Sequence, residues 1–134
     1  AIGEAADWQP EDLTAWWDMV RGDEDDREHG ALMLSLFEAF GEEVPGELWD
    51  ALLEGPQRVT VAAPQAALWF QLRSAAENGL LGKTVLLSLL VLGDGGPSQA
   101  APRILYDVLG RLQGVGLEAE ARMLAVEAAL AAGI

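Results

Sequence analysis

One histidine and two short motifs are the parts of this chain whose residue types could do chemistry. His29 is the only histidine of the 134 residues, and cysteine is absent, so the nitrogen and sulfur ligands of a zinc site are nearly missing. A catalytic histidine would also need a nucleophile or a second acid beside it, and the chain contains neither a G-x-S-x-G nor an H-E-x-x-H motif. We therefore expect a protein that is not an enzyme and holds no metal ion or cofactor.

Residues 79–84, with the sequence G-L-L-G-K-T, match part of a phosphate-binding loop. The full motif has a glycine five residues before Gly82, where this chain has Glu77, and a carboxylate there would repel phosphate. No predicted strand precedes the segment, so its backbone N–H groups are not aimed at a phosphate chain. The segment is instead predicted to be a turn between two helices.

Residues 23–28, with the sequence D-E-D-D-R-E, form a strongly acidic run. Calcium takes about six to eight oxygen ligands, but this run lacks the pattern of a calcium-binding loop because Arg27 stands where the third acid belongs. Asp25 and Asp26 are better suited to cap the following helix and to complement its dipole, an effect worth about 0.5–2 kcal/mol.

Negative charge is concentrated in the first two fifths of the chain. Residues 1–54 contain 16 of the 22 acidic residues and only Arg21 and Arg27 as basic ones, a net charge of −14, whereas residues 55–134 contain six of each sign. Such a field repels nucleic acid and anionic membranes and attracts cationic partners in a salt-dependent way. The alternative is that these acids only keep helix faces hydrated and the chain soluble.

Four of the five tryptophans lie in or beside these acidic runs. Trp16 and Trp17 are about 100° apart on a helix, so both cannot occupy the centre of one buried stripe. Aromatic rings among acids suit a cationic segment through burial, charge attraction and cation–π contact, although the same rings could instead cover the open end of a helical stack. The candidate partner-binding residues are Trp8, Trp16, Trp17, Trp49, Asp23, Glu24, Asp25 and Asp26.

Apolar residues spaced three and four apart, with proline and glycine between the segments, predict an all-α protein. The R-V-T-V stretch at residues 58–61 is the only one with an extended pattern. About seven helices are predicted, over residues 10–21, 27–40, 45–53, 64–78, 81–92, 102–113 and 117–132.

Length and composition predict one domain over residues 1–134. Apolar residues make up 51% of the chain, and a chain of this size buries roughly two thirds of its unfolded surface. Its longest apolar run, residues 85–92, is far shorter than the ~20 residues of a membrane-spanning helix. The chain begins with Ala1 and has no signal-like start, so we expect a processed protein or a piece of a larger one. The compartment is left open.

The predicted helix pairs resemble one another. Trp16 corresponds to Trp69 at an offset of 53 residues, and Trp69 corresponds to Tyr106 at an offset of 37. A period near 37 is typical of repeats that are one helix pair each and that bury their apolar faces by stacking.

Over residues 11–41 and 64–132, the sequence resembles tetratricopeptide-like helical repeats. A large aromatic residue opens the first helix of each pair, and G-L-E-A-E-A at residues 116–121 is similar to the hairpin of such repeats, although no copy carries the complete signature. The resemblance implies a short α-solenoid of three stacked antiparallel helix pairs, with residues 42–63 as an insertion between the first two. A compact helical bundle is the alternative, because leucine- and alanine-rich helices align with one another easily.

These features predict a protein–protein interaction module. Its acidic, tryptophan-containing N-terminal region or a concave helix surface would receive a basic or amphipathic segment of another protein. The alternatives are a structural cap or spacer of a larger multidomain protein, such as an envelope protein, a glycan-binding domain, and an accessory helical domain of an enzyme. Leu117, Leu124 and Leu130 are predicted to be core, unless the apolar C-terminal run packs on a missing domain or a second copy. The oligomeric state is left open.

Overall fold

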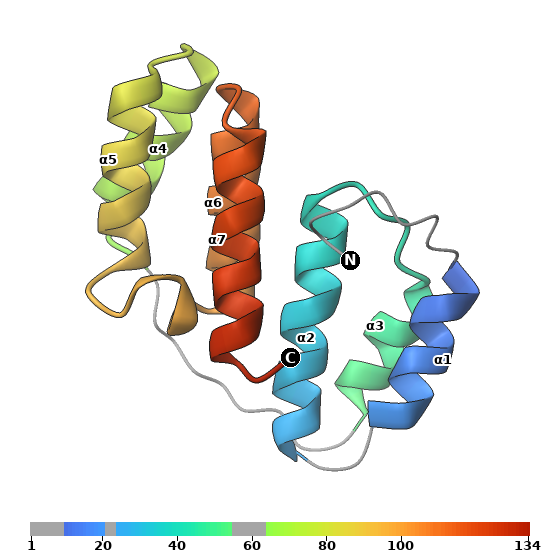
Figure 1. The fold of residues 1–134 in the computed structure, drawn as a ribbon. Helices are drawn as coiled ribbons and strands as arrows, with labels where there is room; N and C mark the ends of the chain where they lie inside the picture. Colours follow the sequence, from blue (N-terminus) through green and yellow to red (C-terminus); the bar gives the residue numbers. More distant parts are fainter. Residues whose placement is uncertain (1–9, 21–23, 55–63) are drawn as a thin grey trace.

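The computed structural model describes residues 10–20, 24–54 and 64–134, which form seven α-helices and one 3₁₀ turn without any strand (Figure 1). The all-α prediction is therefore confirmed, and the predicted extended stretch at residues 58–61 lies outside the described residues. The elements are α1 (Pro10–Val20), α2 (Glu24–Ala39), α3 (Gly46–Leu53), α4 (Ala66–Glu77), α5 (Leu81–Leu92), η1 (Gly96–Ser98), α6 (Pro102–Gly114) and α7 (Glu118–Ala131).

The turn between α4 and α5 is built around Gly79, whose φ of +67° lies in the left-handed region that glycine enters most easily. The N–H of Gly79 donates to the carbonyl of Ala76 (3.0 Å), and the N–H of Leu80 donates to that of Ala75 (2.9 Å). This pair of bonds satisfies carbonyl groups at the end of α4. The prediction that residues 79–84 begin with a helix–helix turn is confirmed.

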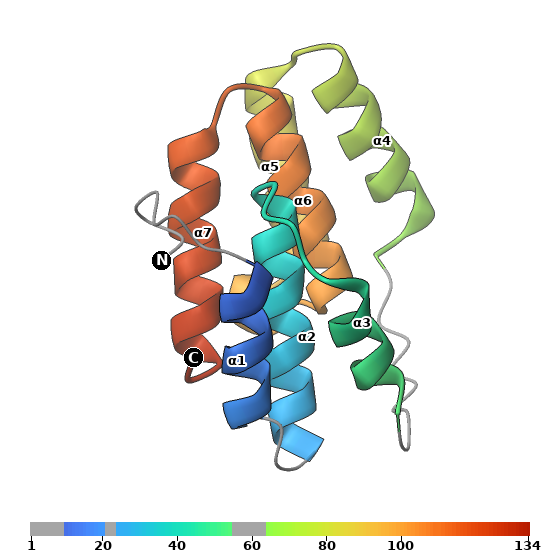
Figure 2. The same cartoon turned by 90° about the vertical axis from the view of Figure 1, so that its right-hand side faces the viewer.

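Two hydrophobic clusters form the core, and α2 contributes to both. Leu34 and Phe37 of α2 pack with residues of α1 and α3, whereas Leu36 of α2 packs with residues of α4 to α7. We call α1–α3 the N-terminal unit and α4–α7 the C-terminal unit. Figure 1 and Figure 2 show that α1 and α3 lie together on the side of α2 that faces away from α6. The helix α2 thus contributes side chains to the cores of both units.

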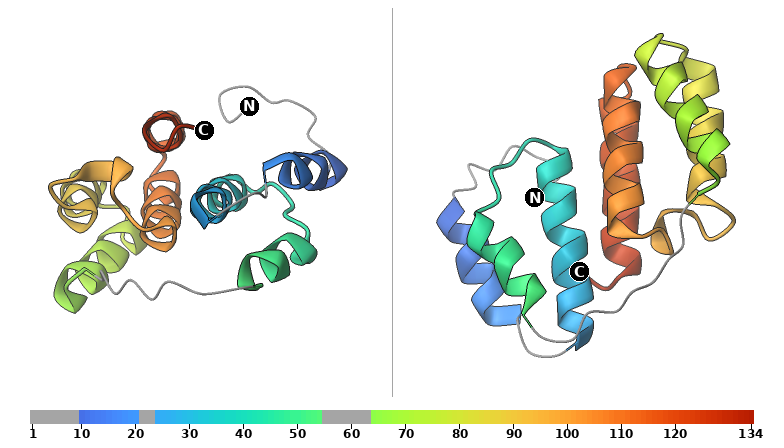
Figure 3. Two further views of the ribbon diagram at one scale, coloured as in Figure 1. Left: turned by 90° about the horizontal axis from the view of Figure 1, so that it is seen from below. Right: turned by 180° about the vertical axis from the view of Figure 1, so that it is seen from behind.

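The C-terminal unit packs against the N-terminal unit through α6 and α2. The helix α6 contacts α4, α5 and α7 as well as α2, and the Gln113 side chain of α6 donates to the carbonyl of Ala39 at the end of α2 (2.9 Å). In a solenoid of consecutive pairs, the second pair would separate the first from the third. Here the third pair, α6 and α7, lies between the other two (Figure 3), which is the order of a compact bundle. The repeat resemblance itself stays a prediction.

Candidate interaction surfaces

Exposed carboxylates lie on all three helices of the N-terminal unit. Its described residues, 10–20 and 24–54, include 13 acidic residues and one basic residue, Arg27. Glu11 on α1 and Glu47 and Asp50 on α3 are exposed. This excess of carboxylates generates a negative potential that a single arginine cannot balance.

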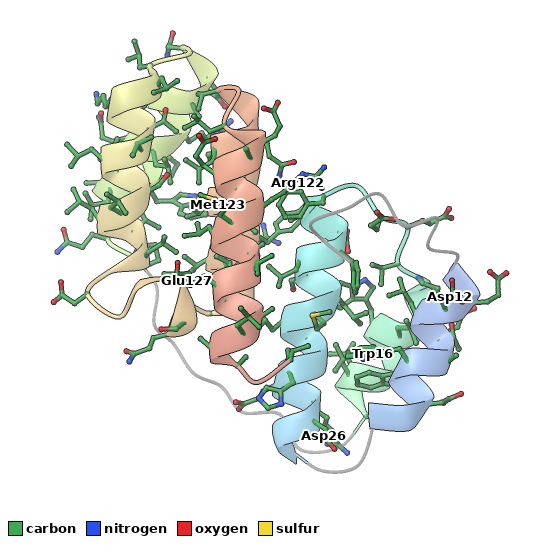
Figure 4. All side chains as sticks on the ribbon, viewed as in Figure 1. Asp12, Trp16, Asp26, Arg122, Met123 and Glu127 are labelled. Atoms are coloured by element: carbon green, nitrogen blue, oxygen red, sulfur yellow. The ribbon has the colours of Figure 1, made fainter. Side chains whose placement is uncertain are left out.

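The tryptophans of this unit lie in and around its core. Trp17 is 4% exposed and its ring packs against the backbone of Gly30. Trp16 and Trp49 are half-buried at the edge of the same cluster. The ring centroids of Trp16 and Trp17 are 6.4 Å apart with the planes tilted by 47°, and the side chain of Trp16 lies between α1 and α3 (Figure 4). Trp17 is therefore a core residue, and Trp16 and Trp49 are the two described tryptophans of this unit whose side chains remain partly exposed to solvent.

The described part of the acidic run, residues 24–28, lies in the first turns of α2 and not in a loop. The helix begins at Glu24, three residues earlier than the sequence analysis predicted, because carboxylates in a first helical turn interact favourably with the helix dipole. Asp26 is half-buried in this first turn. The described residues contain no group of three or more histidine, cysteine or acidic side chains placed to hold a metal ion.

Part of the predicted binding set cannot be placed. Trp8 and Asp23 lie outside the described residues, and nothing is described of the side chains of Glu24 and Asp25. The participation of these four residues in binding stays a prediction. We call the exposed carboxylates of α1 and α3, together with Trp16 and Trp49, the acidic surface.

The helix α7 turns its small side chains inward and its large apolar side chains outward. Ala121, Ala125 and Ala128 are buried against the rest of the C-terminal unit, whereas Met123 and Leu130 are each 68% exposed. Alanine allows close approach of neighbouring helices, here α6 and α2. Leu130, predicted from the sequence to be core, is therefore a surface residue.

Four outward residues of α7 form an open, mainly apolar surface along the helix. Arg122 and Glu127 lie on its two sides, as Figure 4 shows. The guanidinium of Arg122 lies 5.3 Å from the centroid of the Phe40 ring, which places it on the side of α7 that faces α2. We call the outward set the α7 stripe, and its residues are Ala119, Met123, Val126 and Leu130.

The helix α5 also has polar residues inside and large apolar residues outside, although Leu87, Val91 and Leu92 of the same helix are buried. Thr84 and Ser88 face the core; the Thr84 hydroxyl donates to the carbonyl of Leu80 (2.8 Å), and the buried Ser88 hydroxyl has no hydrogen-bond partner among the described residues. Leucines cover the outer side of the helix instead. We call these exposed leucines the α5 face, and they are Leu86, Leu89 and Leu90.

Sequence reasoning missed the α7 stripe and the α5 face because both helices carry apolar residues on every side. Periodicity then predicts a helix without telling which side is buried. The available signal was the residue size, since alanines alternate with large apolar residues along α7.

Comparison with protein-family models, with curated proteins and with solved structures finds no significant match to this chain. None of the described helices is long and apolar enough to span a membrane. The class that the fold defines is that of small all-α proteins, and a functional assignment has to come from the surfaces themselves.

Proposed function

We propose that the protein is a protein–protein interaction module whose acidic surface binds an arginine- or lysine-rich segment of another protein. The observation that carries this proposal is the segregation of charge: the described part of the N-terminal unit has 13 acidic residues for one basic residue, and five of its nine exposed acids lie on α1 and α3, the two helices that carry Trp16 and Trp49.

Charge and aromatic rings act together on a basic partner. Carboxylates increase the rate of encounter with a cationic segment, and each exposed ion pair adds about 0.2–1 kcal/mol. A guanidinium over an indole face adds about 0.5–1 kcal/mol at an exposed site. Because Trp16 and Trp49 are half-buried in the core of the unit, their rings are held in place and lose little freedom on binding.

A dye-labelled peptide of eight arginines is a suitable probe, with binding followed by fluorescence anisotropy. Neutralising three exposed acids of α1 and α3, in a Glu11→Gln/Glu47→Gln/Asp50→Asn variant, should weaken binding about tenfold if each acid contributes about 0.5 kcal/mol. Raising the salt concentration should weaken the wild-type complex as well.

A matched control separates a surface from a general charge effect. Asp94→Asn/Glu118→Gln/Glu120→Gln removes three exposed acids from the C-terminal unit and leaves the same net charge as the first variant. The proposal predicts that this control binds the peptide within about twofold of the wild type. Equal weakening in both variants would mean that the peptide senses only the total charge, and the proposed surface would be wrong.

The aromatic contribution has its own paired test. Trp16→Leu keeps apolar packing but removes the ring face, and it should weaken the arginine peptide about two- to fivefold. Trp69→Leu changes a half-buried tryptophan on α4 and should have no effect on binding. Unchanged affinity in the folded Trp16→Leu variant would remove Trp16 from the surface.

A further inference from the structure

A second association surface lies on α7, and it is independent of the acidic surface. Ala119, Met123, Val126 and Leu130 follow one another at spacings of four, three and four residues. These are the spacings of the a and d positions of a heptad, the positions that form the seam between two paired helices. In this assignment Met123 and Leu130 are a positions.

No described element packs against the α7 stripe, since Met123 and Leu130 are mostly exposed. Covering large apolar side chains by a partner helix is favourable in water. The opposite side of α7 is already packed on α6, η1 and α2, so a partner can approach only from the stripe.

The charges beside the stripe identify the partner. Arg122 precedes the a position Met123 and is a g position, and Glu127 follows the d position Val126 and is an e position. In two parallel helices, a g residue lies beside the e residue of the other helix that is five positions later, and Arg122 and Glu127 are five positions apart. Two copies of α7 in parallel would therefore form two Arg–Glu ion pairs.

We propose that the protein forms a homodimer through parallel pairing of the α7 stripes of two copies. The contact of Arg122 with the Phe40 ring holds its guanidinium on one side of the stripe, and parallel pairing places Glu127 of the partner subunit on that same side. Antiparallel pairing is disfavoured because it places the g positions of the two copies on the same side, so that the Arg122 residues of both subunits would repel each other.

The shape of the molecule permits this pairing. Seen along the helices, α7 stands out from the row formed by α5, α6, α2 and α1 (Figure 3, left). A twofold axis parallel to α7 directs the two subunits away from each other and puts their N-terminal units on opposite sides. The two regions of net charge −14 are then as far apart as the contact allows, which limits their repulsion.

Sedimentation equilibrium of the 134-residue chain at about 10–500 µM tests the dimer. A seam of two heptads is small, so we expect a dissociation constant of order 10–100 µM, which lies within this concentration range. Leu130→Glu should weaken association at least tenfold. Leu89→Glu, at an equally exposed leucine of the α5 face, is the control and should leave the dissociation constant within about twofold of the wild type. A wild-type chain that stays monomeric throughout overturns the proposal.

Charge reversal tests the parallel register. Arg122→Glu and Glu127→Arg each place like charges across the seam twice per dimer, and each should weaken association about tenfold. The double variant Arg122→Glu/Glu127→Arg should recover most of the affinity, and an equimolar mixture of the two single variants should form a heterodimer. Circular dichroism confirms that each variant remains helical.

Two further results would contradict the proposal. Single charge variants that dimerise as well as the wild type would show that Arg122 and Glu127 do not face each other across the seam. A Met123→Glu variant that dimerises as well as the wild type would show that the α7 stripe is not the seam. Because the acidic surface is intact in every α7 variant, failure of the dimer leaves the proposed function standing.

Discussion

The two units of the molecule use opposite arrangements of apolar and polar residues. In the N-terminal unit, the large side chains of Trp17, Leu34 and Phe37 are inside and carboxylates cover the surface. In the C-terminal unit, α7 turns alanines inward, and both α7 and α5 keep large apolar residues such as Leu130 and Leu89 outside. The negative surface of the first unit attracts positively charged groups at a distance. The exposed apolar surfaces of the second unit can be removed from water only by direct contact with another surface.

This difference teaches that net charge and apolar exposure mark different kinds of association. Long-range attraction raises the rate of encounter and weakens with salt, whereas an apolar seam depends mainly on the area removed from water and is much less sensitive to salt. Under the two proposals above, one chain would bind a basic protein through its acidic surface and a second copy through its α7 stripe at the same time.

The largest expected effect comes from the two leucines that α2 contributes to different cores. Leu34 and Leu36 are both fully buried, and truncation of either to alanine should lower the free energy of unfolding by about 2–5 kcal/mol. Leu34→Ala should speed amide hydrogen exchange mainly in α1 and α3, and Leu36→Ala mainly in α4 to α7. If both variants lost protection from exchange equally in all helices, the two units would not differ in local stability.

Glycine-to-alanine substitutions should have opposite signs in the two units. A methyl group at Gly30 would overlap the Trp17 ring, so Gly30→Ala should lower the free energy of unfolding by about 1–3 kcal/mol. A methyl group at Gly110 in α6 would have no atom within 4 Å. Gly110→Ala should therefore raise the free energy of unfolding by about 0.5–1 kcal/mol, because glycine is a poor helix former. Urea titration measures both, and stabilisation by Gly30→Ala would show that the Trp17 ring is not fixed there.

The smallest effect is expected at a surface ion pair of α4. Arg73 Nε donates a 2.9 Å hydrogen bond to Glu77, and this bond together with the charge of Arg73 holds the pKa of Glu77 below its ordinary value. A lowered carboxyl pKa contributes stability above the ordinary pKa of the group, and this contribution is lost as the pH falls through the lowered pKa. Since both side chains are exposed, the stability change should be small.

An NMR titration checks this last prediction more directly than unfolding does. The pKa of Glu77 should return towards its ordinary range in Arg73→Gln, because the variant removes both the hydrogen bond and the positive charge that lower it. An unchanged Glu77 pKa in the variant would show that the pair does not persist in solution.

Helix positions were largely predictable from the sequence, because proline and glycine act locally. The first residue of α1 and of α6 is a proline, at Pro10 and Pro102, and α5 occupies the predicted residues 81–92. A proline without an N–H group suits the first helical turn wherever the rest of the chain lies. The start of α2 was predicted too late, because an acidic run is typical of both a loop and a first helical turn.

The direction of each side chain was not predictable, because it depends on contacts between distant residues. Whether Trp16 or Trp17 enters the core is decided by the space beside Gly30, on the next helix. Which side of α7 is buried is decided by its packing on α6 and α2, and the packing of α2 on α6 joins segments far apart in the chain. The candidate surfaces therefore required the structure, although the charge asymmetry was visible in the sequence.

Sedimentation velocity of the dye-labelled arginine peptide, mixed with the wild-type chain at concentrations above its dimer dissociation constant, tests most directly whether the two units associate independently. The account predicts that the peptide sediments with the dimer at low salt, and that added salt releases the peptide while the dimer persists. Sedimentation of the peptide with monomer only, or loss of the dimer as the peptide binds, would contradict it, because both partners would then share one surface.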